Sequence, residues 1–312
     1  MHIEFKDRVR GSLMGLAVGD ALGFGTEFMT QEEVKLNYPT GLKRYTDIVE
    51  DKFRSADQIG RWTDDTDMMI AILDSLLEQE KVDLTDIAAN FKEWAQSAPT
   101  DIGLLTEDVL QHPNYLEQPQ AVAKREWITS GRNSAGNGGI MRTAVTAIWD
   151  YKDWAKVEEN TANICKLTHY DPRCVGSCVV IAYMINQLIQ EKSFTLRELI
   201  ELSKKYDERI GKFIEFGYQK DLKKISLDNS GIGYTLKTMA AGLWAYNFAP
   251  SFEQGIQTIL LEGGDADTNC AVAGALLGAK FGYPALPAEL ISNLLGSAHL
   301  NTKVDLLLEL IQ

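Results

Sequence analysis

Apolar residues recur at helical spacing along almost the whole chain, and this pattern constrains the fold more than any other feature. The segment 64–79 begins with carboxylates and continues MMIAILDSLLEQ, the pattern of an amphipathic helix with an acidic first turn. The other segments with helical spacing are 83–96, 155–168, 175–190, 196–204, 208–217, 234–247, 252–261, 267–281, 287–297 and 301–311. Hairpin signals are missing, because the flanks of Asn137-Gly138 do not alternate. With no internal repeat and no linker, the sequence predicts one all-α domain over residues 1–312.

Glycines recur at every fourth position in and just after the apolar segment 11–22. They are Gly11, Gly15, Gly19 and Gly23. Because residues four apart lie on one face of a helix, these glycines form a stripe without side chains. Such a stripe lets a second helix approach closely, so we expect a tight helix pair here.

Helix-capping residues precede several of the periodic segments, namely Asp83, Thr195, Ser251 and Asn301. Between about residues 97 and 140 the periodicity fails, and Pro, Gly, Asn and Ser are frequent. A loop this long in a compact domain is usually functional. The sequence therefore predicts a functional loop at 97–140.

The chain is acidic, with 31 Lys and Arg residues, 44 Asp and Glu residues and a net charge of -13. Such a surface repels phosphate backbones, so we expect no nucleic-acid partner. The sequence shows no run of eighteen apolar residues, no signal-peptide pattern and no disulfide spacing among its 4 cysteines. We therefore expect a cytoplasmic protein without a membrane span.

Carboxylates and hydroxyls gather in two short segments, each at the start of an apolar helix. The first is WTDDTD at 62–67, and the second is GGDADTN at 263–269. One acid per helix would be enough to cap it and to complement its dipole. Several acids this close together repel one another unless a cation lies between them. We therefore favour a site for hard cations over capping alone.

The ligand types narrow the choice of metal. With 4 histidines and no H-E-x-x-H motif, a zinc or iron site built on histidine is disfavoured. The D-D-x-x-D motif of isoprenoid synthases is also absent, since Met68 stands where its third acid would be. Carboxylates and hydroxyls favour Mg²⁺, Mn²⁺ or Ca²⁺. Two helix starts supply enough oxygens for two ions that share a bridging Asp.

Three further features have both a functional and an ordinary interpretation. The segment 134–142, SAGNGGIMR, leads from the long loop into an expected helix, and its backbone N–H groups suit a phosphate, although turns use such strings often. His169 is either a substrate contact or, with Cys165, Cys174 and Cys178, part of a zinc site, and buried free cysteines are the common alternative. Glu27 is either a surface acid or faces the glycine-striped helix.

Taken together, six segments resemble the ADP-ribosylglycohydrolase family. They are GLAVGDALGFGTEF, WTDDTDM, GNGGIMR, LTHYDPRC, GYTLKTMAAGLWAY and EGGDADTNCAVAGALLGAKFG. They follow one another in the family's order from about residue 9 to residue 283. The resemblance implies an orthogonally packed helical bundle with a binuclear magnesium or manganese centre. Segment 97–131 carries no family motif, and we expect it to bear specificity on the substrate side.

The resemblance also implies roles for particular residues. The metal ligands would be Thr63, Asp64, Asp65, Asp265, Asp267 and Thr268. Among them Asp267 would bridge the two ions. Asp64, Asp65 and Glu27 would be catalytic, with Asp64 or Glu27 as the base. The residues expected to bind substrate are Ser134, Gly136, Asn137, Gly138, His169 and Tyr234.

The resemblance implies hydrolysis of a glycosidic bond that joins ADP-ribose to an acceptor. The cleavage passes through an oxocarbenium-like state, which nearby carboxylates stabilise. We expect ADP-ribosyl-arginine on a protein as the substrate, and the alternatives are ADP-ribosyl-serine or a free ADP-ribosylated metabolite. A non-catalytic ADP-ribose-binding or structural relative is the other class of protein. Such a relative is expected to lose metal-binding acids, whereas this chain keeps all the candidate ligands.

Overall fold

The computed structural model describes residues 2–99 and 101–311, and within them the chain is all-α, as the sequence predicts. The α-helices are α1 (Phe5–Gly23), α2 (Gln31–Asn37), α3 (Asp64–Gln79), α4 (Leu84–Gln96), α5 (Leu104–Gln111), α6 (Pro119–Thr129), α7 (Trp154–Cys165), α8 (Pro172–Ile189), α9 (Leu196–Ser203), α10 (Arg209–Gly217), α11 (Thr235–Phe248), α12 (Phe252–Leu260), α13 (Ala266–Phe281), α14 (Ala288–Asn293) and α15 (Ser297–Ile311). Short 3₁₀ helices lie at Phe24–Thr26, Tyr45–Asp47, Thr143–Ala147, Leu222–Lys224 and Tyr283–Ala285. Within the described ranges the extended backbone is limited to an isolated bridge between Gly136 and Tyr234.

The glycine stripe on α1 packs directly against α13. A Cβ atom on Gly11, Gly15 or Gly19 would lie 2.4, 2.4 or 2.1 Å from a backbone oxygen of α13. A Cβ atom on Gly274 or Gly278 of α13 would likewise lie 2.1 or 1.8 Å from a backbone oxygen of α1. These distances leave no room for side chains, so the backbones of the two helices are in contact. The predicted tight helix pair is confirmed, and its partner is α13.

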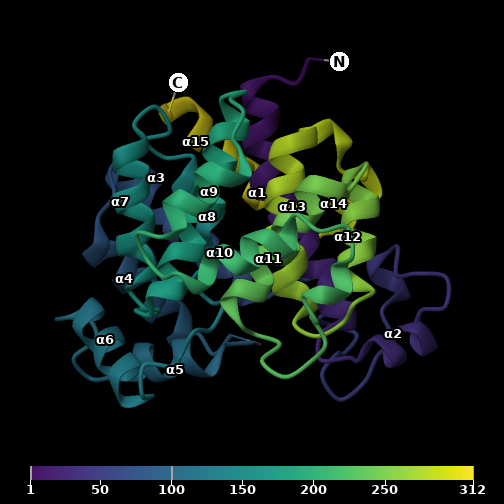
Figure 1. The fold of residues 1–312 in the computed structure, drawn as a ribbon, viewed down its shortest axis with the longest axis horizontal. Coiled ribbons are helices and arrows are strands. Elements are labelled where there is room, and N and C mark those ends of the chain that lie inside the picture. The colour runs from purple at the N-terminus through teal and green to yellow at the C-terminus, as the bar shows by residue number, and fades with distance from the viewer. Residues whose placement is uncertain (1, 100, 312) are drawn as a thin grey trace.

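The direction of this helix pair decides where the acidic segments lie. Gly11 lies against Gly278, and Gly23 lies against Ala266, so the pair is antiparallel. Figure 1 shows α1, in purple, beside the yellow-green α13 at the centre of the molecule. The C-terminal end of α1 therefore meets the acidic N-terminal end of α13.

The remaining helices surround this pair. Helices α11 and α12 pack on α13, and α8 packs on both α11 and α13. Helix α3 contacts α4 and α15, and α15 also contacts α1. Figure 1 shows α5 and α6 at one lower corner of the molecule and α2 at the opposite one. Long-range packing thus encloses the central pair and leaves these short helices at the edge.

Helix α8 is long and apolar enough to cross a membrane by length and composition alone, with a mean hydropathy of 1.3 over 18 residues. In this structure 78% of that window is buried among other helices. The contacts to α7, α11 and α13 therefore account for its apolar surface. The described cysteines on and around it, Cys165, Cys174 and Cys178, are free and buried, as is Cys270.

Three sequence predictions about local structure are wrong. Segment 97–140 is not one loop, because α5 and α6 lie within it. Asn301 is not a cap, since α15 already begins at Ser297, whereas Asp83, Thr195 and Ser251 do cap α4, α9 and α12. The segment GNGGIMR does not open an α-helix but forms turns that lead into the 3₁₀ helix Thr143–Ala147. There the side chain of Arg142 donates to the Gly138 carbonyl at 2.8 Å, in place of a helical backbone donor.

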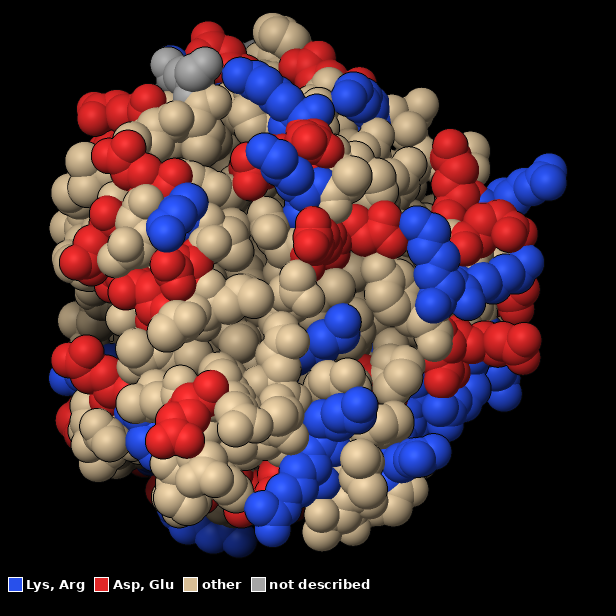
Figure 2. Space-filling model, turned by 90° about the vertical axis from the view of Figure 1, so that its left-hand side faces the viewer, with Lys and Arg blue, Asp and Glu red and all other residues tan. Residues whose placement is uncertain are grey.

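The charge of the molecule is not spread evenly. Figure 2 shows a face on which acidic and basic side chains alternate, with basic side chains gathered toward its lower right. Many acids do not contribute to the surface at all, since Asp20, Asp65 and Asp267 are each at most 2% exposed. The net charge of -13 is therefore partly internal, and these buried carboxylates lead to the site.

Candidate active site

Asp20 on α1 anchors the start of α3. Its carboxylate accepts the backbone N–H groups of Thr63 at 2.9 Å and Thr66 at 3.1 Å, and the hydroxyl of Thr66 at 2.5 Å. Thr63 itself makes no side-chain capping bond, so a residue from another helix caps α3. Burial raises the pKa of Asp20 to about 7 against the effect of these donors. The sequence analysis did not select Asp20, whose only signal is an acid inside an apolar run.

The two predicted acidic segments converge. The Thr63 hydroxyl lies 3.3 Å from an oxygen of Asp65 and 3.5 Å from an oxygen of Asp267, and it can donate its one hydrogen to either. Thr268 on α13 donates to the same oxygen of Asp65 at 3.3 Å. The starts of α3 and α13 thus face each other with their hydroxyl and carboxylate oxygens in contact. This convergence follows from the α1–α13 pair and from the Asp20 cap.

Asp65 and Asp267 each keep one buried carboxylate oxygen without a hydrogen-bond donor. Burial raises the pKa of Asp64, Asp65 and Asp267 well above the usual value, and neighbouring carboxylates add to the effect. Such oxygens are costly when ionised unless a positive charge is present. A hard divalent cation would supply that charge, and carboxylate and hydroxyl oxygens are its preferred ligands. The chemistry of this donor set therefore fits a metal ion.

Glu27 completes a second group of acids. One carboxylate oxygen each from Glu27, Asp101 and Asp267 lie within 4.8 Å of one another. Burial raises the pKa of Glu27 well above its usual value, and the nearby Asp265 and Asp101 raise it further. The arrangement can hold a cation or keep a proton. Of the two interpretations of Glu27, the structure places it beside the glycine-striped helix and not at the surface.

The backbone around Glu27 is tied to the start of α13. Phe28 donates its N–H to Gly264 at 2.7 Å, and Gly264 donates to Met29 at 2.8 Å. Gly264 has a φ of +72°, and a Cβ there would lie 2.2 Å from the Leu227 carbonyl. Only glycine allows this close approach. Arg54, itself 1% exposed, donates twice to the Glu27 carbonyl at 3.0 Å and fixes the loop from the other side.

Asp101 was missed by the sequence analysis. It lies just before α5 in a segment without a recognisable motif, so no local pattern selects it. Burial raises its pKa, and Asp265 adds to that shift. Its position supports the expectation that segment 97–131 contributes to the substrate side.

Asp265 points toward the glycine loop. Its carboxylate accepts from the Asn137 side-chain amide at 2.7 Å, and the same amide donates to Thr238 at 3.0 Å. Asn137 therefore connects the loop 136–138 to the start of α13. A cation held by Asp265 would lie next to the ligand bound by this loop.

These elements line a cleft of about 520 Å³. The predicted site residues on its wall are Glu27, Asp64, Asp265, Asp267, Thr268, Gly136, Asn137, Gly138 and His169. Asp101, Ile102, Gly103 and Leu104 complete the wall on the α5 side. Thr63 and Asp65 lie behind it and contact the wall residues through the hydrogen bonds given above. The cleft is large enough for a nucleotide-sized ligand.

Ser134 and Tyr234 are not among the lining residues of this cleft. The backbone of Tyr234 bridges to Gly136, and its ring packs against Phe213 with centroids 5.5 Å apart and under the Arg173 guanidinium at 5.6 Å. Ser134 donates its N–H to the Ser130 hydroxyl at 3.2 Å. Both residues therefore support the loop at the edge of the site, and their predicted contact with substrate stays a prediction.

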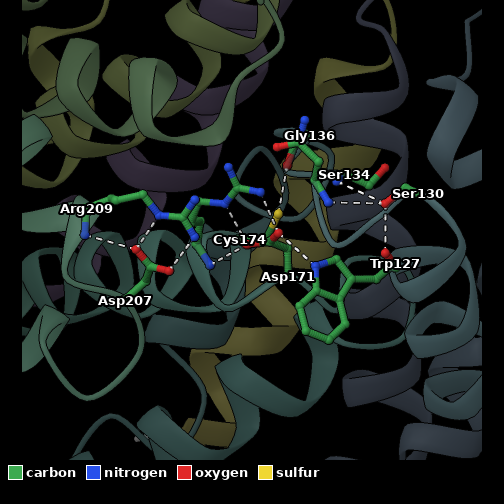
Figure 3. Close-up of polar contacts among 10 residues, drawn as sticks. Trp127, Ser130, Ser134, Gly136, Asp171, Cys174, Asp207 and Arg209 are labelled. Atoms are coloured by element: carbon green, nitrogen blue, oxygen red, sulfur yellow. Dashed lines mark hydrogen bonds and ion pairs between the residues drawn. The ribbon is translucent and has the colours of Figure 1, made fainter.

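A polar network fixes the outer side of the glycine loop (Figure 3). Trp127 at the end of α6 donates to Asp171 at 2.8 Å, and Asp171 also pairs with Arg173 at 2.6 Å. The Cys174 thiol donates to the Gly136 carbonyl at 3.2 Å. Figure 3 shows how these residues lie around Gly136 and Ser134. Helices α6 and α8 are thereby both connected to the loop.

Asp67 and the cysteines near His169, which the sequence offered as possible ligands, lie outside the acidic site. Asp67 accepts from the indoles of Trp62 at 2.7 Å and Trp94 at 3.1 Å, so its charge is satisfied away from the other acids. Within residues 2–99 and 101–311, three acidic, histidine or cysteine side chains come within 4.8 Å of one another only at Glu27, Asp101 and Asp267. Cys165, Cys174 and Cys178 therefore form no such group with His169, and of the predicted metal-binding acids only Asp267 belongs to one. The alternative of buried free cysteines holds.

The scaffold is all-α, and the acidic starts of α3 and α13 meet at the wall of a cleft. Comparison with known proteins identifies the class of protein. The family model described as ADP-ribosylglycohydrolase matches residues 1–312, and the chain belongs to this family. It is therefore an enzyme of the type that hydrolyses glycosidic bonds of ADP-ribose.

Individual relatives agree with this assignment. The chain is 28% identical over 292 residues to the ADP-ribosyl-[dinitrogen reductase] glycohydrolase of Rhodospirillum rubrum, covering 92% of this chain and 90% of that protein. It is 27% identical over 310 residues to the ADP-ribosylarginine hydrolase Tri1 of Serratia proteamaculans, covering 93% and 76%. A solved structure titled ADP-ribosylglycohydrolase-related protein complex superposes with a TM-score of 0.71 at 25% identity, covering 99% of both chains.

Proposed function

We propose that this enzyme uses two divalent cations, Mg²⁺ or Mn²⁺, to cleave the bond between ADP-ribose and an arginine side chain of a protein. One observation carries the metal part of the proposal: the unpaired buried oxygens of Asp65 and Asp267 at two facing helix starts. The ions would be held by Thr63, Asp64, Asp65, Asp265, Asp267 and Thr268. Bound there, they would act as Lewis acids and lower the pKa of a water molecule.

The residues of the chain divide the remaining tasks. The loop 136–138 and His169 would bind the ADP-ribose on one wall of the cleft. Glu27 has a raised pKa and lies beside Asp267, so it is suited to hold the proton that the leaving group takes up. Asp64, on the same wall, would accept a proton from the attacking water. The carboxylates around the ring would stabilise an oxocarbenium-like state.

The choice of an arginine acceptor rests on Asp101 and Glu27. Their carboxylate oxygens lie within 4.8 Å of each other on the cleft wall. The Asp101 carboxylate beside the proton-holding Glu27 suits a guanidinium, which is planar and always charged. The names of the relatives from Serratia proteamaculans and Pseudomonas putida, both ADP-ribosylarginine hydrolases, support the same choice. The four free buried thiols support the further proposal of a reducing, cytoplasmic location.

The direct test is release of ADP-ribose from an ADP-ribosyl-arginine protein, with Mg²⁺ or Mn²⁺ and with EDTA as the control. We expect release that EDTA abolishes. Release from ADP-ribosyl-serine or from a free conjugate, but not from the arginine substrate, would contradict the acceptor and keep the reaction class. Failure on all substrates without bound metal would favour a binding protein.

The Asp101→Asn variant tests the acceptor separately. Removing one carboxylate weakens the pair that would bind the guanidinium, so kcat/KM on the arginine substrate should fall by about tenfold or more. Asp108→Asn on the exposed side of α5 is the matched control and should leave activity unchanged. Equal kcat/KM values for the Asp101 variant and the wild type would contradict an acceptor role.

A further inference from the structure

His169 lies on the cleft wall with one ring nitrogen facing inward. Its Nε2 atom is next to the loop glycines, because a Cβ built on Gly136 or Gly138 would lie 3.3 or 3.1 Å from it. Gly136, Gly138 and His169 all line the cleft. The absence of side chains on the two glycines leaves Nε2 open toward a ligand. The protonation of this nitrogen therefore decides what His169 can bind.

Behind His169, a buried arginine fixes the hydrogen-bond pattern. Arg142 is 1% exposed and donates to the Thr168 hydroxyl at 2.7 Å and to the Gly138 carbonyl at 2.8 Å. Its guanidinium stacks over Phe91 at 4.5 Å. A guanidinium has only donors, so the Thr168 oxygen must be the acceptor in this contact.

The Thr168 hydroxyl then has one hydrogen left to donate. Its second contact is to Nδ1 of His169, at 2.8 Å. Among the described residues no other acceptor for this hydrogen lies within bonding distance. The hydroxyl therefore donates to Nδ1, and Nδ1 carries no proton. Burial and the nearby Arg142 lower the pKa of His169 to about 3, so the ring is neutral at neutral pH.

We propose that Arg142 and Thr168 act as positioning residues that hold His169 as the neutral Nε2–H tautomer and aim one N–H donor into the cleft. Resting on the proposed function, the inference is that this donor binds an oxygen of ADP-ribose, either phosphoryl or ribose hydroxyl. The opposite tautomer would direct a nitrogen lone pair at a phosphoryl oxygen and repel it, whereas a ribose hydroxyl could donate to that lone pair. The hydrogen-bonded series Arg142–Thr168–His169, here called the relay, thus selects a hydrogen-bond acceptor at this point of the cleft.

The tautomer is measured directly by long-range ¹H–¹⁵N NMR on protein labelled at histidine. The chain has 4 histidines, and the His169→Gln variant identifies the resonances of His169. At neutral pH we expect Nε2 to be protonated and Nδ1 to have the shift of a hydrogen-bonded acceptor. A protonated Nδ1 in the wild-type protein would overturn the inference.

Two variants of Thr168 test the relay. Thr168→Val removes the hydroxyl, so the Nδ1 resonance should move away from the hydrogen-bonded position, and Thr168→Ser should keep it. Thr146→Val is the matched control, because it removes another buried hydroxyl, bonded to Thr161 at 2.8 Å. An Nδ1 resonance unchanged in Thr168→Val would overturn the role of Thr168.

Binding of ADP-ribose in the presence of Mg²⁺, measured by calorimetry, gives the functional consequence. Thr168→Val should bind about tenfold more weakly, as for the loss of one hydrogen bond to a charged or strongly polar group, while Thr168→Ser and Thr146→Val should bind like the wild type. If Thr168→Val binds as tightly as the wild type, His169 does not donate to the ligand. A wild-type protein with the expected tautomer but no hydrolytic activity would leave the relay standing and contradict the proposed function.

Discussion

Asp65 and Asp67 stand two positions apart in the first turn of α3, and their surroundings are opposite. Asp65 is 1% exposed and keeps one oxygen without a donor, while two threonine hydroxyls contact the other. Asp67 accepts one indole N–H on each oxygen. The carboxylate of Asp65 is thus arranged to bind a cation, whereas the carboxylate of Asp67 is satisfied by two neutral N–H donors.

This contrast predicts different effects of the same substitution. Asp65→Asn should lower divalent-metal affinity and kcat by about a hundredfold or more, because it removes a charge that the cation needs. Asp67→Asn should lower stability through its indole bonds but leave metal affinity close to the wild type. Calorimetric titration with Mn²⁺ and a turnover assay measure both. Full activity of Asp65→Asn with metal would contradict the proposed centre.

At the residue scale, the sequence pointed to the acids that occur in clusters and, through the family resemblance, to Glu27, but it missed Asp20 and Asp101. WTDDTD and GGDADTN are visible because acids repel, so their crowding requires an explanation. Asp20 and Asp101 are single acids in segments far from these clusters in sequence. Their roles arise only when α1 and the start of α5 fold against α3 and α13, and no local pattern contains that information.

At the scale of elements, the α1–α13 contact holds the site together. Gly19→Ala should be strongly destabilising, since the new Cβ would lie 2.1 Å from the Cys270 carbonyl oxygen and force the helices apart. We expect a loss of about 1–3 kcal/mol or more in the free energy of unfolding, together with weaker metal binding. Separation of the helices would move Glu27 away from Asp267.

The control for this prediction is Gly211→Ala in α10. A Cβ there meets only the Ile200 side chain at 3.9 Å, so the substitution adds no clash. It should stabilise the protein by about 0.4–1 kcal/mol, because alanine loses less entropy in a helix. Urea unfolding curves distinguish the two. A Gly19→Ala variant as stable as the wild type would show that the helices separate at little cost.

Helices with a wide apolar face were predicted well, and those with a narrow one were not. Helix α6 buries only Val122 and Ala123, and α5 begins with Leu104, which is 81% exposed. These helices cover the edge of the site and do not fill the core, and both are short helices beside turns, which hides them in a segment rich in Pro, Gly, Asn and Ser. The segment GNGGIMR was also wrongly predicted to lead directly into an α-helix. The side chains of Arg142 and Thr143 instead donate to the carbonyls of Gly138 and Gly139, and the 3₁₀ helix 143–147 follows.

At the scale of the whole molecule, the buried acids make stability depend on pH. The pKa of Asp20 rises from 3.8 to about 7, and those of Asp64, Asp65, Asp267 and Glu27 rise well above their usual values, mainly because of burial. Between the unfolded and the folded pKa the folded state binds more protons, so stability falls as pH rises through this window.

Thermal unfolding in EDTA should therefore give a Tm that decreases from about pH 4 to pH 7. The free energy of unfolding should fall by about 1.4 kcal/mol for each unit by which the folded pKa of a group exceeds its unfolded pKa. Saturating Mg²⁺ or Mn²⁺ should raise Tm most at the upper end of this range, because cations bind the ionised carboxylates. The Asp65→Asn variant should show a smaller metal effect. A metal-free protein whose Tm increases across this range would contradict the burial of these acids.

On the ribosome, α1 emerges long before α13. Until residues 266–281 leave the exit tunnel, the glycine face of α1 has no partner, and Glu27 has no Asp267 beside it. The nascent chain must keep this apolar face from other chains until α13 is available. A fragment that ends before α13 therefore lacks both the partner of α1 and Asp267.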